Sequence, residues 1–232
     1  MDEIERLKKD YEEICADYLK KDFWSPFKPE MLYIYQERDF ALVNLLKKHS
    51  INSLKNKKLL DIGCGGGYGI RRLLSLDASP ELIYGIDILE DRIKEARRIN
   101  PNVNYLVGNA EKLPFENEKF DLIIQYMAFS SVSEDQVKRN MALEMVRVLR
   151  DDGLIVWYDL KFDLFKKSKV AREIKKEEII KLFPNCSFDF NVVILHIAIL
   201  KRLIKFSRSL CLLLSHFPFL CSHYLASIKK CA

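Results

Sequence analysis

The sequence lacks the features that would place it outside the cell, in a membrane or around a metal ion. Its charged start, MDEIERLKKDYEE, is not followed by an apolar segment, so we expect no secretory signal. The six cysteines form no CxxC pair and show no paired spacing with the four histidines, which predicts reduced thiols and no metal site. The apolar runs NVVILHIAIL and SLCLLLSHFPFLC are shorter than the roughly 20 residues that a bilayer requires. Together these absences predict a cytoplasmic protein.

Acidic residues are also absent, from Asn191 to the end of the sequence. Because the whole chain carries a net charge of +5 and this segment +6, residues 1–190 carry −1 (5 − 6). Two interpretations of the segment stay open. It is either a buried strand with a helix packed on a sheet, or a basic amphipathic surface that contacts anionic lipid or a lipid-linked sugar. The basic residues are Lys201, Arg202, Lys205, Arg208, Lys229 and Lys230.

Two regions differ in pattern. Residues 1–50 show apolar and aromatic residues at helical spacing, which predicts a helical N-terminal extension that covers a binding site. From residue 57 onward, short apolar runs alternate with amphipathic stretches, which predicts parallel βαβ units. We therefore expect an α/β protein with a doubly wound sheet, divided into a cap over 1–50 and a main domain over 51–232.

Glycine is concentrated in one place, the segment KKLLDIGCGGGYGI over residues 57–70. Glycine lets a backbone approach a ligand closely, and the N–H groups that follow a strand favour an anionic group. The dinucleotide pattern G-x-G-x-x-G fails here, because its third glycine falls on Tyr68 or Ile70. A nucleotide-dependent oxidoreductase is therefore disfavoured. The pattern D-x-G-x-G-x-G does fit, and a tight turn without a ligand is the plain alternative.

This pattern resembles motif I of the class I S-adenosylmethionine (SAM) methyltransferases, in the type 11-like subgroup. Three further segments resemble that family in order: VGNAEKLPF (107–115), FDLIIQ (120–125) and EMVRVLRDDGLIVW (144–157), with Asp151, Asp152 and Gly153 in a turn. The resemblance spans about residues 57–160. It implies a Rossmann-like methyltransferase fold with seven strands in the order 3-2-1-4-5-7-6, of which strand 7 is antiparallel.

The resemblance implies SAM as cofactor and assigns a set of residues to it. Asp87 ends the strand YGIDI, where a carboxylate can accept both ribose hydroxyls. Asn109 stands where the family usually has Asp, and its amide oxygen can still accept a hydrogen bond from the adenine. The expected cofactor residues are Asp61, Gly63, Cys64, Gly65, Gly67, Asp87, Ile88, Asn109, Ala110, Glu111, Gln125 and Tyr126.

Methyl transfer to a hydroxyl acceptor also requires a base. Asp159 ends the predicted strand GLIVWYD and is our candidate, although acids at strand ends also act as caps. The expected acceptor-site residues are Tyr33, Tyr35, Arg38, Phe129, Ser130 and Tyr158.

The residues at the end of the fourth predicted strand suggest the acceptor class. Methyltransferases that act on nucleic-acid bases usually carry D/N-P-P-Y/F/W there, whereas this sequence has Gln125-Tyr126-Met127-Ala128. No basic stripe suits a phosphate backbone. We therefore expect a small-molecule, sugar or lipid-linked acceptor and no nucleic acid. A protein that binds SAM without turnover is the main alternative.

Overall fold

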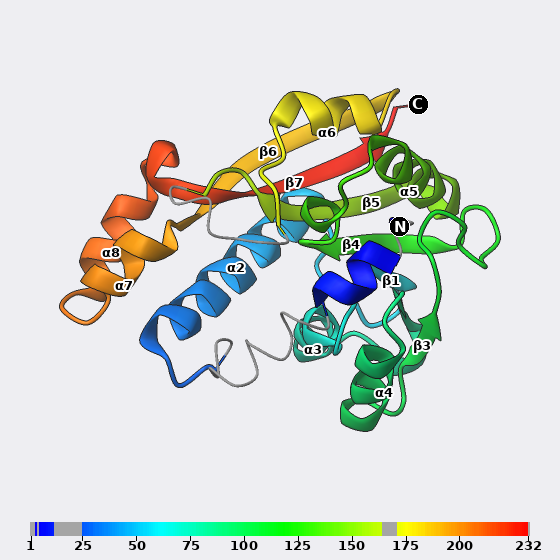
Figure 1. Ribbon diagram of the computed structural model, residues 1–232, viewed down its shortest axis with the longest axis horizontal. Helices are drawn as coiled ribbons and strands as arrows, with labels where there is room; N and C mark the ends of the chain where they lie inside the picture. The colour runs from blue at the N-terminus through cyan, green and yellow to red at the C-terminus, as the bar shows by residue number, and fades with distance from the viewer. Residues whose placement is uncertain (1–2, 4, 12–24, 164–170, 232) are drawn as a thin grey trace.

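A computed structural model describes residues 3, 5–11, 25–163 and 171–231. The strands are β1 (Leu59–Ile62), β2 (Ile83–Asp87), β3 (Asn104–Val107), β4 (Phe120–Tyr126), β5 (Leu149–Leu160), β6 (Cys186–Leu195) and β7 (Cys221–Lys230). In this part of the chain they form one sheet in the order β3-β2-β1-β4-β5-β7-β6 (Figure 1). This confirms the predicted strand order.

The strand directions also follow the prediction. β1 pairs in parallel with β2 and β4, and β4 pairs in parallel with β5. β7 runs antiparallel between β5 and β6. The central strands are apolar runs buried on both faces, which is why they show no alternation of polar and apolar residues.

Helices cover both faces of the sheet. The helices are α2 (Pro29–Lys48), α3 (Tyr68–Ser75), α4 (Glu90–Ile99), α5 (Asp135–Val148), α6 (Lys176–Leu182), α7 (Ile197–Leu203) and α8 (Arg208–Ser215). One face packs apolar side chains of α5 and α6, and the opposite face packs those of α2, α3 and α4. Leu42, Leu45 and Leu46 bring the last turns of α2 into this second core. The sheet is thus covered as a doubly wound fold requires.

The turn predicted at Asp151, Asp152 and Gly153 is wrong. Helix α5 ends at Val148, and β5 begins at the next residue. Phe120 pairs with Leu149 and Leu122 with Leu154, so the register shifts and the exposed residues Arg150, Asp151 and Asp152 have no strand-pairing partner in β4. The structure therefore has an irregularity within β5 where the sequence predicted a turn before the strand.

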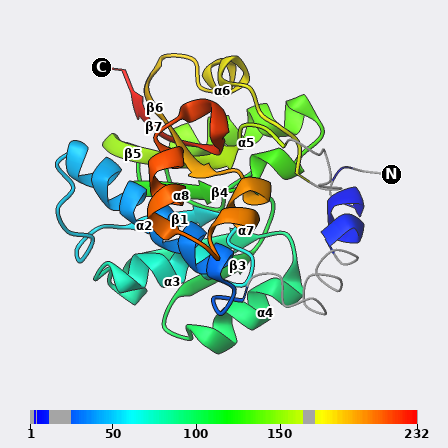
Figure 2. The same cartoon turned by 90° about the vertical axis from the view of Figure 1, so that its left-hand side faces the viewer.

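The basic, apolar segment near the end of the chain contains two helices rather than one. β6 leads into α7 and α8, and the chain then returns as β7. Figure 2 shows both helices in front of the sheet, beside α2. No described helix is long and apolar enough to cross a membrane.

Candidate functional site

The glycine-rich loop lies at the carboxyl end of β1 and leads into α3. The amides of Gly63 and Cys64 donate to the carbonyl oxygen of Ile86 at 2.9 and 3.1 Å, so the loop is fastened to the end of β2. Gly67 caps α3 with a φ of 77°, and a Cβ there would lie 2.9 Å from the Tyr105 hydroxyl. Both its conformation and its surroundings therefore require glycine.

Asp87 connects the loops that follow β1 and β2. Its Oδ2 accepts the Gly65 amide at 2.8 Å, and its Oδ1 accepts the Leu89 amide at 2.9 Å. Burial raises the pKa of this carboxyl, while the amides oppose that rise. Asp87 thus holds the glycine loop at the position where the sequence predicted a ribose-binding acid.

Asp61 is buried on the same face of the sheet as α2 and α3. Burial, and then the nearby Asp87, raise the pKa of its carboxyl well above the usual range. The close approach of α3 depends on Gly69, because a Cβ there would lie 2.8 Å from Asp61 Oδ2 and 2.9 Å from the Tyr126 ring. The first turn of α3 is therefore fitted against this acid.

Four tyrosine rings surround the guanidinium of Arg38, which projects from α2. Its Cζ lies 4.8 Å from the ring centre of Tyr68 and 5.0 Å from that of Tyr126. The rings of Tyr158 and Tyr35 lie at 5.6 and 5.7 Å. We call these four tyrosines the tyrosine cage. The cage joins α2, the start of α3 and the ends of β4 and β5, so it borders the glycine loop.

A tight turn after β4 orients Tyr126. Met127 has a φ of 64°, and its amide donates to Tyr158 O at 2.9 Å. Gln125 Oε1 accepts the Ala128 amide at 3.0 Å. Such a strained backbone persists only where its surroundings hold it. Gln125, expected to contact the cofactor, here supports this turn.

Asp159 lies beneath the turn after β4 and is fully buried. Its Oδ2 accepts the Ser130 amide at 3.2 Å, and its Oδ1 accepts the Leu160 amide at 2.9 Å. Burial raises the pKa of Asp159 to about 6. These contacts give Asp159 a positioning role, and its role as a base stays a prediction.

The expected acceptor residues separate into two groups. Tyr35, Arg38 and Tyr158 come together in the tyrosine cage. Phe129 packs in the core, where its ring centroid lies 4.3 Å from that of Trp157, and the next residue, Ser130, is also buried. Tyr33 lies in a separate cluster with Leu195, Leu200 and Cys211. The structure does not bring Phe129, Ser130 or Tyr33 to the cage.

The segment expected to meet adenine forms its own hydrogen-bonded turn. Asn109 Oδ1 accepts the Glu111 amide at 2.9 Å, and its Nδ2 donates to Glu111 Oε1 at 3.0 Å. Asn140 of α5 donates to Glu111 Oε2 at 2.8 Å. Ala110 is partly buried between them. These contacts fasten the segment, which follows β3, to α5.

Sequence reasoning missed Tyr68, Gly69 and His223. The His223 ring stacks on Tyr158 with centroids 4.9 Å apart, and burial lowers the pKa of His223 to about 3. The predicted strand order held a signal for it, because the start of strand 7 must lie beside the end of strand 5. In the structure His223 pairs with Leu160.

The N-terminal region approaches this edge of the sheet from two sides. Residues 5–11 are helical, and Arg6 donates to Ser131 O at 2.9 Å while Leu7 enters the core. Helix α2 supplies Tyr35 and Arg38 from the opposite face. Residues 12–24 of the expected helical cap lie outside the described residues. The division of the chain at residue 50 stays a prediction.

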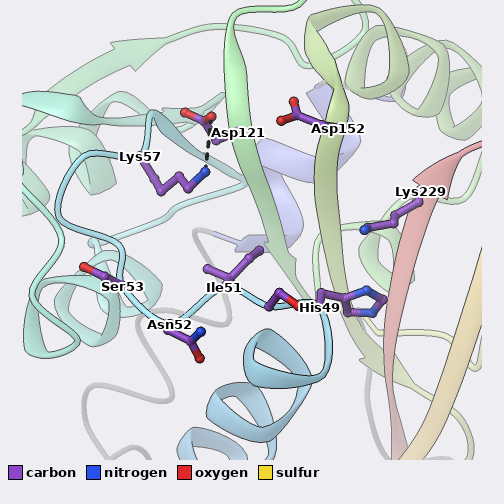
Figure 3. A pocket seen from close by; sticks show the side chains of 9 residues that line it. His49, Ile51, Asn52, Ser53, Lys57, Asp121, Asp152 and Lys229 are labelled. Carbon is purple, nitrogen blue, oxygen red and sulfur yellow. Dashed lines mark ion pairs between the residues drawn. The ribbon is translucent and has the colours of Figure 1, made fainter.

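A cavity of about 380 Å³ lies at the opposite edge, near the amino ends of β1 and β4 (Figure 3). Two polar contacts lie at this cavity: His49 Nε2 lies 2.7 Å from Ser227 Oγ, and Lys57 Nζ lies 3.7 Å from Asp121 Oδ1. No group of three or more potential metal-ligating His, Cys, Asp or Glu occurs among the described residues.

Comparison with known proteins identifies the central part of the chain. Residues 60–157 match a family model described as a methyltransferase domain. A phthiotriol/phenolphthiotriol dimycocerosates methyltransferase of Mycobacterium ulcerans is 34% identical over 47% of this chain and 39% of its own length. A tRNA U34 carboxymethyltransferase of Nautilia profundicola is 36% identical over 53% of this chain and 41% of its own. The chain thus spans less than half of these relatives.

Solved structures agree on the fold. A structure from Methanosarcina mazei described as a SAM-dependent methyltransferase aligns with a TM-score of 0.59 at 17% identity. The alignment covers 81% of this chain and 98% of that one. The fold of this chain is therefore one that solved structures share.

Proposed function

We propose that this chain, whose residues 60–157 match a methyltransferase domain, transfers a methyl group from SAM to a small-molecule, sugar or lipid-linked acceptor. The observation that carries the proposal is the glycine loop held by Asp87 at the carboxyl end of β1. In doubly wound sheets this edge is where ligands bind.

The residues at this edge fit the donor. We infer that the Gly63–Gly67 loop holds its methionine part, Asp87 its ribose, and the turn of Asn109 and Glu111 its adenine. We infer that the buried acid Asp61 meets the amino group of that methionine part. When bound, SAM supplies a methyl group already activated by a sulfonium.

The protein contributes orientation and exclusion of water. The tyrosine cage borders the loop with aromatic faces, which attract cationic groups. The turn after β4, held by Asp159, fixes Tyr126 at this border. Positioning of this kind contributes at most about 7–11 kcal/mol to a well-oriented reaction.

A thermal-shift experiment tests the cofactor assignment. Purified protein is heated with SAM, S-adenosylhomocysteine or NAD. A ligand at 100 times its dissociation constant stabilises the folded state by about 2.7 kcal/mol, so we expect the midpoint to rise by several degrees with both sulfur ligands and not with NAD. A shift with NAD alone would overturn the proposal and leave the fold intact. If SAM raises the midpoint but no tested acceptor leads to S-adenosylhomocysteine formation, the protein binds SAM without turnover.

For the acceptor, a lipid-linked molecule is the class we favour. The mycobacterial relatives are named for dimycocerosate acceptors, and the motif typical of base methylation is missing after β4. The tRNA-modifying relative supplies the competing class. The screen therefore runs lipid extracts, sugars and bulk tRNA in parallel, with labelled SAM. Label in tRNA alone would reject the lipid assignment.

We further propose that the α7–α8 segment contacts an anionic lipid bilayer. Phe206, Leu213, Phe217 and Phe219 are exposed there, beside the exposed basic side chains of Lys201, Arg202, Lys205 and Arg208. Residues 191–231 contain no acidic residue, and the described ion pair of Arg208 is with Glu37 of α2, at 3.9 Å. Exposed apolar side chains next to basic ones suit the interface of an anionic membrane.

Co-sedimentation with vesicles containing phosphatidylserine tests this contact. We expect binding at low salt that is lost in Phe217→Asp/Phe219→Asp. The matched control is Leu143→Asp, because Leu143 is an exposed apolar residue on α5, outside this segment. Wild-type binding equal to that of phosphatidylcholine vesicles, or equal loss in the control, would contradict the proposal.

A further inference from the structure

We propose that Arg38 forms an anion-binding subsite at the tyrosine cage, which takes a carboxylate or phosphate group of one of the two substrates. The inference rests on the proposed function, since it assigns the ligand chemistry of the same site. The guanidinium of Arg38 has N–H groups for which the described residues provide no hydrogen-bond acceptor.

Arg38 is only 7% exposed, yet its Nε and Nη2 have no hydrogen-bond partner among the described residues. A buried guanidinium without hydrogen bonds is costly, and buried charges are normally paired. Arg72 on α3 provides a partial contrast, because its Nε also has no hydrogen-bond partner among the described residues but its charge is paired. It also approaches the Tyr68 ring, at 5.7 Å, but its Nη1 lies 3.2 Å from Asp39 Oδ2 and its side chain is one-third exposed.

The cage stabilises the charge of Arg38 without satisfying its N–H groups. The four rings lie at 4.8–5.7 Å from its Cζ, the range of cation–π contacts. Such contacts accept no directed hydrogen bond in the guanidinium plane. Donors therefore remain available for a planar anion, which a guanidinium binds with two parallel hydrogen bonds.

The position of Arg38 relates this subsite to both substrates. The charge of Arg38 acts on the buried Asp61 carboxyl and lowers its pKa, but the two side chains form no ion pair. A ligand with an amino and a carboxylate group, such as the methionine part of SAM, would satisfy both. Tyr126 and Tyr158, two of the four rings around Arg38, lie at or near the ends of strands β4 and β5, where the acceptor is expected. An acidic acceptor would reach Arg38 from there.

Binding measurements separate the two sources. Calorimetry measures the affinities of SAM and decarboxylated SAM for the wild type, for Arg38→Met and for the control Arg72→Met. If the donor carboxylate binds Arg38, the wild type and the control prefer SAM by about 10- to 100-fold, the gain expected for charge-assisted hydrogen bonds. In Arg38→Met that preference disappears, because affinity for SAM falls while affinity for decarboxylated SAM is unchanged.

If the anion belongs to the acceptor, Arg38→Met leaves the affinities for both donors unchanged. Inorganic pyrophosphate, added to protein saturated with S-adenosylhomocysteine, then raises the unfolding midpoint of wild type and Arg72→Met but not of Arg38→Met. Absence of both effects overturns the subsite. A wild type that binds no SAM at all contradicts the proposed function instead, so the two failures are distinguishable.

Folding of the variant is checked without ligand. Because Arg38→Met removes a buried charge that lacks partners, we expect its unliganded unfolding midpoint to equal or exceed that of the wild type. If it does not fold, Arg38→Lys retains the charge but not the planar pair of donors. The subsite then predicts a reduced preference for SAM, or a reduced pyrophosphate effect, in Arg38→Lys. Wild-type behaviour in both measurements overturns it.

Discussion

The sheet has one edge formed by the amino ends of its parallel strands and one formed by their carboxyl ends. The two differ in whether their charged groups are buried. At the amino edge a cavity of about 380 Å³ is lined by side chains that are exposed or half-buried, and Lys57 pairs there with Asp121. At the carboxyl edge, within the described part of the chain, Asp61 is buried without an ion-pair partner and Arg38 lacks partners for two of its nitrogens. Charged groups that water can reach do not require a ligand to stabilise them. Buried charged groups without ion-pair partners, such as Arg38, indicate that the carboxyl edge is the one that binds a ligand.

The largest effect is expected from removing an acid at the carboxyl edge. Asp87→Ala removes the acceptor for the Gly65 and Leu89 amides together with the expected ribose contact. Because hydrogen bonds to charged groups contribute about 1.5–3 kcal/mol each, affinity for S-adenosylhomocysteine should fall about 100-fold or more by calorimetry. Asp121→Ala, at the amino edge, should stay within about twofold of wild type. Equal losses of affinity in both variants would contradict the conclusion that the carboxyl edge binds the cofactor and the amino edge does not.

A smaller effect is expected where a helix approaches an acid closely. In Gly69→Ala the new Cβ would lie 2.8 Å from Asp61 Oδ2, so the acid or Tyr126 must move. We expect a loss of about 1–3 kcal/mol in the free energy of unfolding and weaker cofactor binding. The control is Gly66→Ala, whose Cβ would meet the flexible ends of Glu95 and Arg92. Denaturant unfolding of both variants gives the difference, and equal stabilities would contradict the packing argument.

The pH dependence of stability should identify the buried acid under the turn. Asp159 has a pKa of about 6 when folded and the usual value of 3.8 when unfolded. Between these values the folded state holds a proton that the unfolded state has lost, so stability falls as the pH rises. The unfolding free energy of the wild type, relative to Asp159→Asn, should decrease from about pH 4 to about pH 6 and then level off. A flat difference across that window would reject a buried carboxyl with a raised pKa.

The smallest effect is expected at the amino edge. Lys57→Gln removes an ion pair whose lysine side chain is 41% exposed. Exposed pairs of this kind contribute about 0–1 kcal/mol, and we expect no change in S-adenosylhomocysteine affinity. Denaturant unfolding and calorimetry check both statements. A loss of cofactor affinity here would show that the two edges are coupled.

The sequence was sufficient to predict the sheet and the glycine loop because those features are local. Apolar runs, their alternation with helices and the spacing from Asp61 to Gly67 are read within a few residues. The strand order followed from a resemblance of four such segments in sequence. The start of β5 was mispredicted, since a register shift between paired strands leaves no mark in the sequence of either strand.

The tyrosine cage could not be predicted because it depends on how α2 is rotated against the sheet. Tyr33 and Tyr35 are two positions apart on a helix and so point in nearly opposite directions. The sequence could indicate only that the two rings diverge. Burial of Leu42, Leu45 and Leu46 against the sheet decides that Tyr35 and Arg38 face Tyr126. Helical periodicity and tertiary packing had to be combined.

The placement of β7 has a consequence for how the chain folds during synthesis. β7 comes after every other strand in the chain, yet it lies between β5 and β6. Until the ribosome has released residues 221–230, the outer side of β5 exposes unpaired backbone groups, and β6 has no described strand to pair with. Exposed edges of this kind favour contacts between chains. Nascent chains that stall before residue 221 should therefore depend on chaperones more than the finished protein.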